Sequence, residues 1–118
     1  MLALAVAASP ADEAQLAGRW VDSERNVVSE LTRSADGVWS GVVVASPRPH
    51  ELGKRSFQGL IWDRKKARFT GKLLKPDDDQ LVDLTLTFVS RDALTGEAGL
   101  FIFTRTLHFT RVVAPDAG

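Results

Sequence analysis

Two arginines near the carboxyl end are the side chains that could most readily bind a ligand or another residue. Arg105 and Arg111 alternate in phase with the apolar Leu107, so all three are expected to face the interior of a sheet. An inward guanidinium needs a partner, because burying an unpaired charge is costly. Arg111 can lie over the face of Trp20. Arg105 can pair with Glu30, bind an anionic group such as a carboxylate at a barrel mouth, or lie near the rim in solvent.

Groups that would support catalysis or metal binding are scarce. The chain has two histidines and no cysteine, which excludes thiol nucleophiles, disulfides and zinc sites built from cysteine and histidine. His50 and His108 have no nucleophile or carboxylate at a recognisable spacing, and no Gly-x-Ser-x-Gly is present. The aspartate run at 77–79 lacks the distal glutamate of a calcium loop and is expected to be a solvated turn. We expect no enzyme activity, catalytic residue, metal or cofactor.

A basic stretch with interleaved aromatic residues is compatible with a nucleic-acid surface. Its members are Lys54, Arg55, Phe57, Trp62, Arg64, Lys65, Lys66, Arg68 and Phe69. The aromatic residues, however, fall at strand positions where core packing is expected, and the basic residues fall at turns. Fifteen basic and fifteen acidic residues also cancel over the chain. We therefore expect no nucleic-acid partner.

The elements that position these residues are strands. From residue 18 onward the apolar pattern has a period of two, and turn residues recur about every ten residues. The predicted strands are 18–22, 27–33, 38–45, 57–62, 67–74, 82–88, 93–98 and 104–113. Most are joined by short turns, and closing eight such strands removes both sheet edges. The predicted fold is all-β, an eight-stranded antiparallel up-and-down barrel.

The two ends of the 118-residue chain differ from the rest. Residues 1–15 begin with an apolar run that contains the small-x-small pattern Val6-Ala7-Ala8, but no basic residue precedes it. We interpret them as a residual signal peptide or a disordered N-terminus, which favours an exported protein, periplasmic or secreted. No other run approaches the length of a membrane span, so we expect a soluble protein without stable membrane insertion. Residues 114–118 are expected to be a disordered tail.

The sequence resembles a lipocalin-like (calycin) barrel in its Gly18-x-Trp20 motif and its late Arg111, which close the base of such barrels. Over residues 16–113 it resembles an exported bacterial domain-of-unknown-function family with this fold. The resemblance rests on GRW at 18–20, VSEL at 28–31, DGVWSG at 36–41, FQGLIWD at 57–63, GKLLKP at 71–76 and TRV at 110–112. The turn after the fifth strand lacks the family's glycine. The resemblance implies a fold and an envelope location, and no activity.

A barrel of this size is either filled by side chains or holds one small ligand. Our first hypothesis is a binding module for a small, mainly apolar ligand, with or without an anionic group, in the cell envelope. The expected contacts are Arg105, Glu30, Trp39, Trp62, Phe88, Phe101 and Phe103, while Gly18, Trp20 and Arg111 close the barrel. The alternative is a filled barrel that serves as a structural or protein-interaction module in the envelope. Its contact would be the apolar run at 100–103 or a sheet edge.

Overall fold

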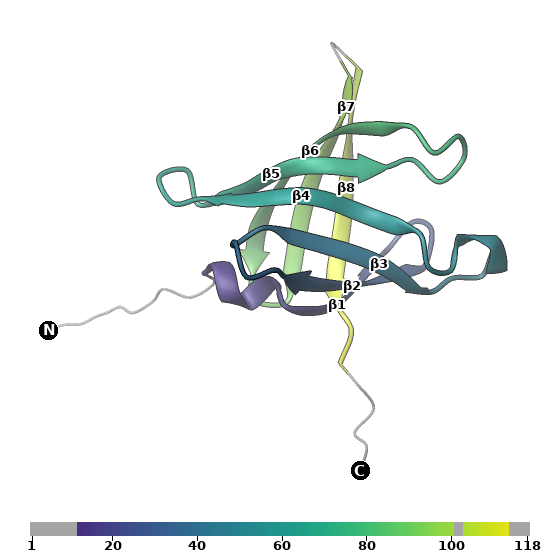
Figure 1. Ribbon diagram of the computed structural model, residues 1–118, viewed down its shortest axis with the longest axis horizontal. Coiled ribbons are helices and arrows are strands. Elements are labelled where there is room, and N and C mark those ends of the chain that lie inside the picture. Colours follow the sequence, from purple (N-terminus) through teal and green to yellow (C-terminus); the bar gives the residue numbers. More distant parts are fainter. Residues whose placement is uncertain (1–11, 101–102, 114–118) are drawn as a thin grey trace, which may run out of the picture.

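The computed structural model describes residues 12–100 and 103–113 and shows an all-β barrel. Its strands are β1 (Gly18–Asp22), β2 (Val27–Arg33), β3 (Trp39–Ala45), β4 (Arg55–Asp63), β5 (Arg68–Leu74), β6 (Leu81–Ser90), β7 (Ala93–Leu100) and β8 (Phe103–Arg111). Each strand pairs antiparallel with the next in the chain, and β8 pairs with β1, which closes the barrel (Figure 1). The predicted eight-stranded up-and-down barrel is confirmed.

Among the described residues, two short 3₁₀ helices accompany the strands. Helix η2 (Glu13–Leu16) precedes β1, and η3 (Pro49–Glu51) lies between β3 and β4. Leu16 of η2 is completely buried. Helix η2 was not among the predicted elements, because a single turn has no periodicity that a sequence pattern can reveal. The expected leader and tail fall mostly on residues 1–11 and 114–118, outside the described residues. Within the described ranges, no helix is long and apolar enough to cross a bilayer.

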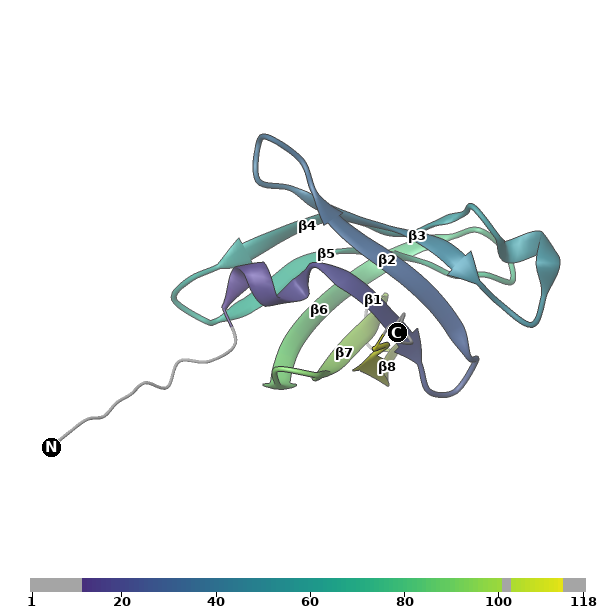
Figure 2. The same ribbon diagram turned by 90° about the horizontal axis from the view of Figure 1, so that it is seen from below.

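The connections gather at two ends of the barrel, which we call the base and the mouth. The base carries η2 and the turns at 34–38, 64–67 and 91–92, while the mouth carries the connections at 23–26, 46–54 and 75–80. In Figures 1 and 2, η2 and the turns at 34–38 and 64–67 lie on the left and the connection at 46–54 lies on the right. Each end therefore collects side chains from several elements.

Alternation decides which side chains face inward. In β6, Val82, Leu84 and Leu86 are buried while the intervening residues are more exposed, as period-two alternation requires. In β2 the buried residues are Ser29 and Leu31. Glu30 has the opposite phase and therefore points outward.

Aromatic side chains fill the base half of the barrel. They are Trp20, Trp39, Trp62, Phe69 and Phe88, with centroids 4.8 to 6.5 Å apart in the contacting pairs. Helix η2 covers this end: the Trp20 indole donates a hydrogen bond to the Leu16 carbonyl at 2.9 Å, and the Trp39 indole donates to the Glu13 carboxylate at 3.0 Å. Both buried indole N–H groups are thus satisfied.

The first and last strands meet at Trp20 and Arg111, which are paired in the sheet. The Arg111 guanidinium lies over the Trp20 ring, with Cζ 4.4 Å from the ring centroid. It also donates hydrogen bonds to the Asp92 carboxylate at 2.8 Å and to the backbone carbonyls of residues 15, 17 and 91. Gly18 has a φ of 120°, and a β-carbon there would lie 3.4 Å from the guanidinium. The predicted pairing of Trp20 with Arg111 is confirmed.

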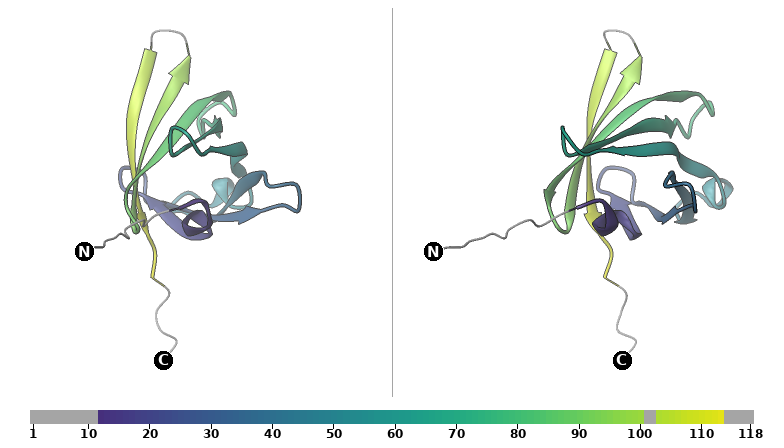
Figure 3. Two further views of the ribbon diagram at one scale, coloured as in Figure 1. Left: turned by 90° about the vertical axis from the view of Figure 1, so that its left-hand side faces the viewer. Right: turned by 60° about the vertical axis from the view of Figure 1, so that its left-hand side comes forward.

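The β7–β8 hairpin extends beyond the rest of the barrel. Strand β1 pairs with β8 only from Phe109 to Arg111, so the first half of β8 has no β1 residue beside it. The hairpin rises away from the other strands in Figure 3. This overhang leaves the mouth open on one side.

Candidate functional site

Two hollows lie at the mouth, and three residues border both: Arg25, Leu73 and Pro76. The inner pocket has a volume of about 90 Å³ and the outer pocket about 600 Å³. Small-molecule sites usually begin at about 300 Å³. The inner pocket alone is therefore too small for a ligand of ordinary size, whereas the outer pocket is large enough.

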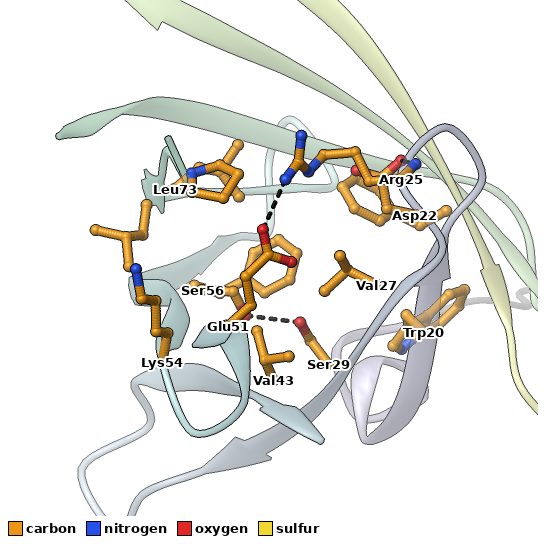
Figure 4. Close-up of a pocket in the computed structure, with 14 residues that line it drawn as sticks. Trp20, Asp22, Arg25, Val27, Ser29, Val43, Glu51, Lys54, Ser56 and Leu73 are labelled. Carbon is orange, nitrogen blue, oxygen red and sulfur yellow. Dashed lines mark hydrogen bonds and ion pairs between the residues drawn. The ribbon is translucent and has the colours of Figure 1, made fainter. Parts of the chain in front are cut away.

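The inner pocket lies directly above the aromatic base. Phe57 and Phe109 pack edge to face at 5.6 Å and, with Trp20, form its apolar floor. The serines Ser29 and Ser56 also line it, and their hydroxyls are 2.7 Å apart (Figure 4). Because these two hydroxyls satisfy one another, they add little polarity to the pocket.

The outer pocket lies between the β5–β6 connection and the inner face of β6, β7 and β8. Its walls include the apolar side chains of Leu73, Val82, Ala98 and Leu107. Each of these residues comes from a different strand, and three of them are buried: Val82, Ala98 and Leu107. The inner faces of these four strands therefore form an apolar wall at this end.

A buried carboxylate fixes the loops beside the inner pocket. Glu51 of η3 is 2% exposed and accepts hydrogen bonds from Arg25 at 2.7 Å, Arg48 at 2.9 Å and Ser46 at 2.7 Å. Burial alone would raise the pKa of Glu51, but the hydrogen bonds from Arg48, Ser46 and Arg25 outweigh it and lower the pKa to about 2. Arg48 also donates to the Arg25 carbonyl at 2.9 Å. Glu51 thus joins the connection at 46–54 to the turn at 23–26.

Every cation that lines either pocket has a carboxylate partner. The pairs are Arg25 with Glu51, Lys54 with Asp79, Lys75 with Asp78 and Arg105 with Glu24, at 2.7, 2.7, 3.4 and 2.6 Å. The positive charge that lines the two pockets is therefore compensated within the protein. A ligand that fits the mouth without displacing a carboxylate must be mainly apolar.

Of the three alternatives for Arg105, the structure shows the position near the rim in solvent. Arg105 borders the outer pocket, but its side chain is 69% exposed and pairs with Glu24. It has the inward phase of its strand, yet it lies on the overhanging part of β8, where no opposite wall buries it. The suggested pairing with Glu30 is wrong, because Glu30 points outward and its carboxylate lies 3.7 Å from Arg19.

The predicted aromatic contacts are divided between the two ends. Trp39, Trp62 and Phe88 belong to the aromatic side chains that fill the base and line neither mouth pocket. Phe103 borders the outer pocket and is 77% exposed. Phe101 lies outside the described residues. Only Arg105 and Phe103 among the predicted contacts are thus shown at the mouth.

Several mouth residues were missed in the sequence. Leu107 and Phe109 carry a clear inward alternation that marked them as core, and this signal does not separate a pocket wall from a filled interior. Glu51 and Arg25 lie in connections without periodicity, so nothing in the sequence indicated that they would meet. In the described parts of the chain, no group of three or more acidic or histidine side chains is arranged to hold a metal ion.

Comparisons of this chain with protein families, with curated proteins and with solved structures found no match. The resemblance to an exported bacterial family therefore stays a prediction.

Proposed function

We propose that this barrel binds one small, mainly apolar ligand in the outer pocket. The observation that carries the proposal is the hollow of about 600 Å³ at an end of the barrel walled by Leu73, Val82, Ala98 and Leu107. The aromatic base is filled, so a ligand enters from the mouth only. A narrow apolar group of the ligand would reach the inner pocket beside Leu73, which borders both hollows.

The ion pairs at the mouth favour a ligand without net charge, but they also identify where an anionic group would bind. The Arg105–Glu24 pair is solvent-exposed on both sides, and such pairs contribute only about 0–1 kcal/mol. A ligand carboxylate would displace Glu24 at little cost. Glu51 is buried and holds three donors, so it would remain in place.

A fluorescent probe tests the proposal. N-phenyl-1-naphthylamine is neutral and apolar, and we expect it to bind the protein saturably with one site per barrel. Ala98→Phe places a ring in the outer pocket and should weaken binding at least tenfold. Ala93→Phe, on the same strand with the opposite phase, is the matched control and should leave binding unchanged.

Two results would contradict the proposal: a wild-type protein that does not bind the probe, or an Ala98→Phe variant that binds as tightly as wild type. Thermal melting of both variants shows whether each is folded. If Ala98→Phe fails to fold, Leu73→Trp fills the pocket from β5 and serves the same purpose.

One observation favours a second candidate function, that of a protein-interaction module. Phe103 is 77% exposed at the start of β8, on the hairpin that projects from the barrel (Figure 3). An exposed aromatic side chain at a projecting edge is typical of contact surfaces. Sedimentation velocity distinguishes the two: self-association that Phe103→Ser abolishes would support an interaction module, and a monomer at all concentrations would count against self-association.

The proposed location is the bacterial cell envelope. It is supported by the apolar sequence at residues 1–11 with its small-x-small pattern and by the family resemblance. Fractionation of cells that express the full chain tests it. Recovery in the envelope fraction is expected, and recovery in the cytoplasm alone would contradict it.

A further inference from the structure

The base carries a concentration of cations without carboxylate partners. In residues 12–100 and 103–113, six lysine or arginine side chains form no ion pair, and five of them are at the base. We call these five the base cluster: Arg64, Lys65, Lys66, Arg68 and Arg91. The sixth is Arg55, at the mouth end of β4. The two ends of the barrel thus differ in electrostatics, because every pocket-lining cation at the mouth is paired.

The structure brings the base cluster together from two turns. The β4–β5 turn carries Arg64, Lys65 and Lys66, and Arg68 begins β5. Lys66 lines a hollow of about 340 Å³ together with Arg91 from the β6–β7 turn. The last β5–β6 pair at this end is Phe69 with Leu86. Strand β6 therefore continues past the start of β5, and its residues 87–90 face the β4–β5 turn across the hollow.

Three carboxylates of the base, Asp63, Asp92 and Glu13, are engaged with groups other than the side chains of the base cluster. Asp63 accepts hydrogen bonds from the backbone N–H groups of Lys65 and Lys66, at 3.0 and 3.2 Å, and so shapes the turn. Asp92 pairs with Arg111 at 2.8 Å, and Glu13 pairs with Arg33 at 3.4 Å. The side chains of Arg64, Lys65, Lys66 and Arg91 are exposed, so their charge faces solvent.

Apolar side chains lie exposed beside the base cluster. Val89 is 68% exposed and lines the same hollow as Lys66 and Arg91, while Ile61 is 56% exposed on β4 just before the turn. Cations mixed with exposed aliphatic side chains are suited to the interface of an anionic lipid bilayer. The anionic headgroups attract the cations, and the aliphatic side chains are buried at the boundary with the acyl chains. A nucleic acid would instead need exposed aromatic faces for stacking, and Trp62 and Phe88 are packed against the core.

We propose that the base cluster docks this barrel on the surface of an anionic lipid membrane, with the mouth facing away from the bilayer. This proposal is independent of the ligand proposed for the mouth, because it uses the opposite end of the barrel and other residues. The base turns at 34–38 and 64–67 lie on the side of the molecule away from the connection at 46–54 (Figures 1 and 2). A docked barrel would therefore keep its pocket open to solvent.

The test is sedimentation of the full chain with vesicles. Vesicles of equal parts phosphatidylglycerol and phosphatidylcholine should bind the protein at low ionic strength, and about 0.5 M salt should release it, because the Debye length is then only a few Å. Lys65→Gln/Lys66→Gln removes two surface cations and should weaken binding about 25-fold, from about fivefold for each charge. Arg55→Gln/Lys72→Gln is the charge-matched control. It removes one cation at the mouth end of β4 and one from the middle of β5, and should change binding less than threefold.

Four results would overturn the proposal. They are the absence of binding to anionic vesicles at low salt, equal losses in the two double variants, equal binding to pure phosphatidylcholine vesicles, and tighter binding to a single-stranded DNA oligonucleotide than to anionic vesicles at the same phosphate concentration. The phosphatidylcholine arm also controls for the apolar sequence at residues 1–11, which would bind both kinds of vesicle. Because Arg55, Lys65, Lys66 and Lys72 are all exposed, both double variants should melt as wild type does.

Discussion

Replacing Glu51 with glutamine removes the negative charge that joins two mouth connections while keeping nearly the same side-chain volume. In the folded protein the Glu51 carboxylate accepts from Arg25, Arg48 and Ser46 within 2.9 Å. The variant leaves the guanidinium groups of Arg25 and Arg48 beside a neutral amide. The NH₂ group of that amide is itself a donor and cannot accept a hydrogen bond from either arginine. Loss of one partner from a buried charged cluster is destabilising because the other partners stay without compensation.

The magnitude follows from the pKa of Glu51, which falls from 4.5 to about 2 on folding. Such a change corresponds to at most about 3 kcal/mol of stability. The Arg25 and Arg48 side chains are 30% and 36% exposed, so solvent screening reduces the expected value to about 1–2 kcal/mol. Because the folded-state pKa is lowered, this stability is fully present above about pH 4.5 and is lost as the pH falls towards 2.

Urea unfolding monitored by tryptophan fluorescence measures the effect. We expect Glu51→Gln to be less stable than wild type by about 1–2 kcal/mol at pH 7, and the two free energies of unfolding to converge near pH 2, where Glu51 becomes protonated. Glu30→Gln is the control, because its weak 3.7 Å pair with Arg19 is exposed and should contribute almost nothing. A difference between Glu51→Gln and wild type that is the same at pH 7 and pH 2 would refute the reasoning.

Three further substitutions test the packing of the barrel by equilibrium unfolding. Trp20→Ala should cost about 3–5 kcal/mol, as for a buried aromatic residue, and an unchanged melting curve would refute the closure at Arg111. Arg111→Lys should cost about 2 kcal/mol or more, since an ammonium cannot both cover the indole and reach Asp92 and three carbonyls; stability equal to wild type would show that charge alone suffices. Gly71→Ala should cost about 1–3 kcal/mol, because its β-carbon would lie 2.8 Å from the Gly59 carbonyl oxygen, and a neutral effect would mean that this backbone can move apart.

Strand number and closure could be predicted from the sequence because they depend on local signals. Period-two alternation in β6 indicates a strand with one buried face, and the Asp36-Gly37 turn indicates the β2–β3 hairpin. Trp20 could be assigned to Arg111 because the first and last strands of a closed up-and-down barrel must be neighbours. These inferences need no knowledge of side-chain environment beyond the phase of each strand.

The mouth could not be predicted because its properties depend on where strands end. Arg105 has the inward phase, but whether that means burial depends on β1 ending opposite Phe109, which no pattern in β8 reveals. Glu30 lies in a strand without a clean apolar face, so the inward phase of β2 was undecided in the sequence. Glu51 contacts Arg25, which lies 26 residues earlier in the chain. Both residues lie in connections without periodicity, so no sequence pattern predicts that they meet.

The occupancy of the outer pocket tests ligand binding by the barrel directly. Native mass spectrometry of the protein purified from its own cells reports bound mass and subunit number together. We expect wild type to carry one small molecule per chain, and the Ala98→Phe variant, purified in the same way, to be unliganded. Wild-type protein that shows only the mass of the bare chain, with no adduct, would contradict the proposal that this barrel binds a small ligand.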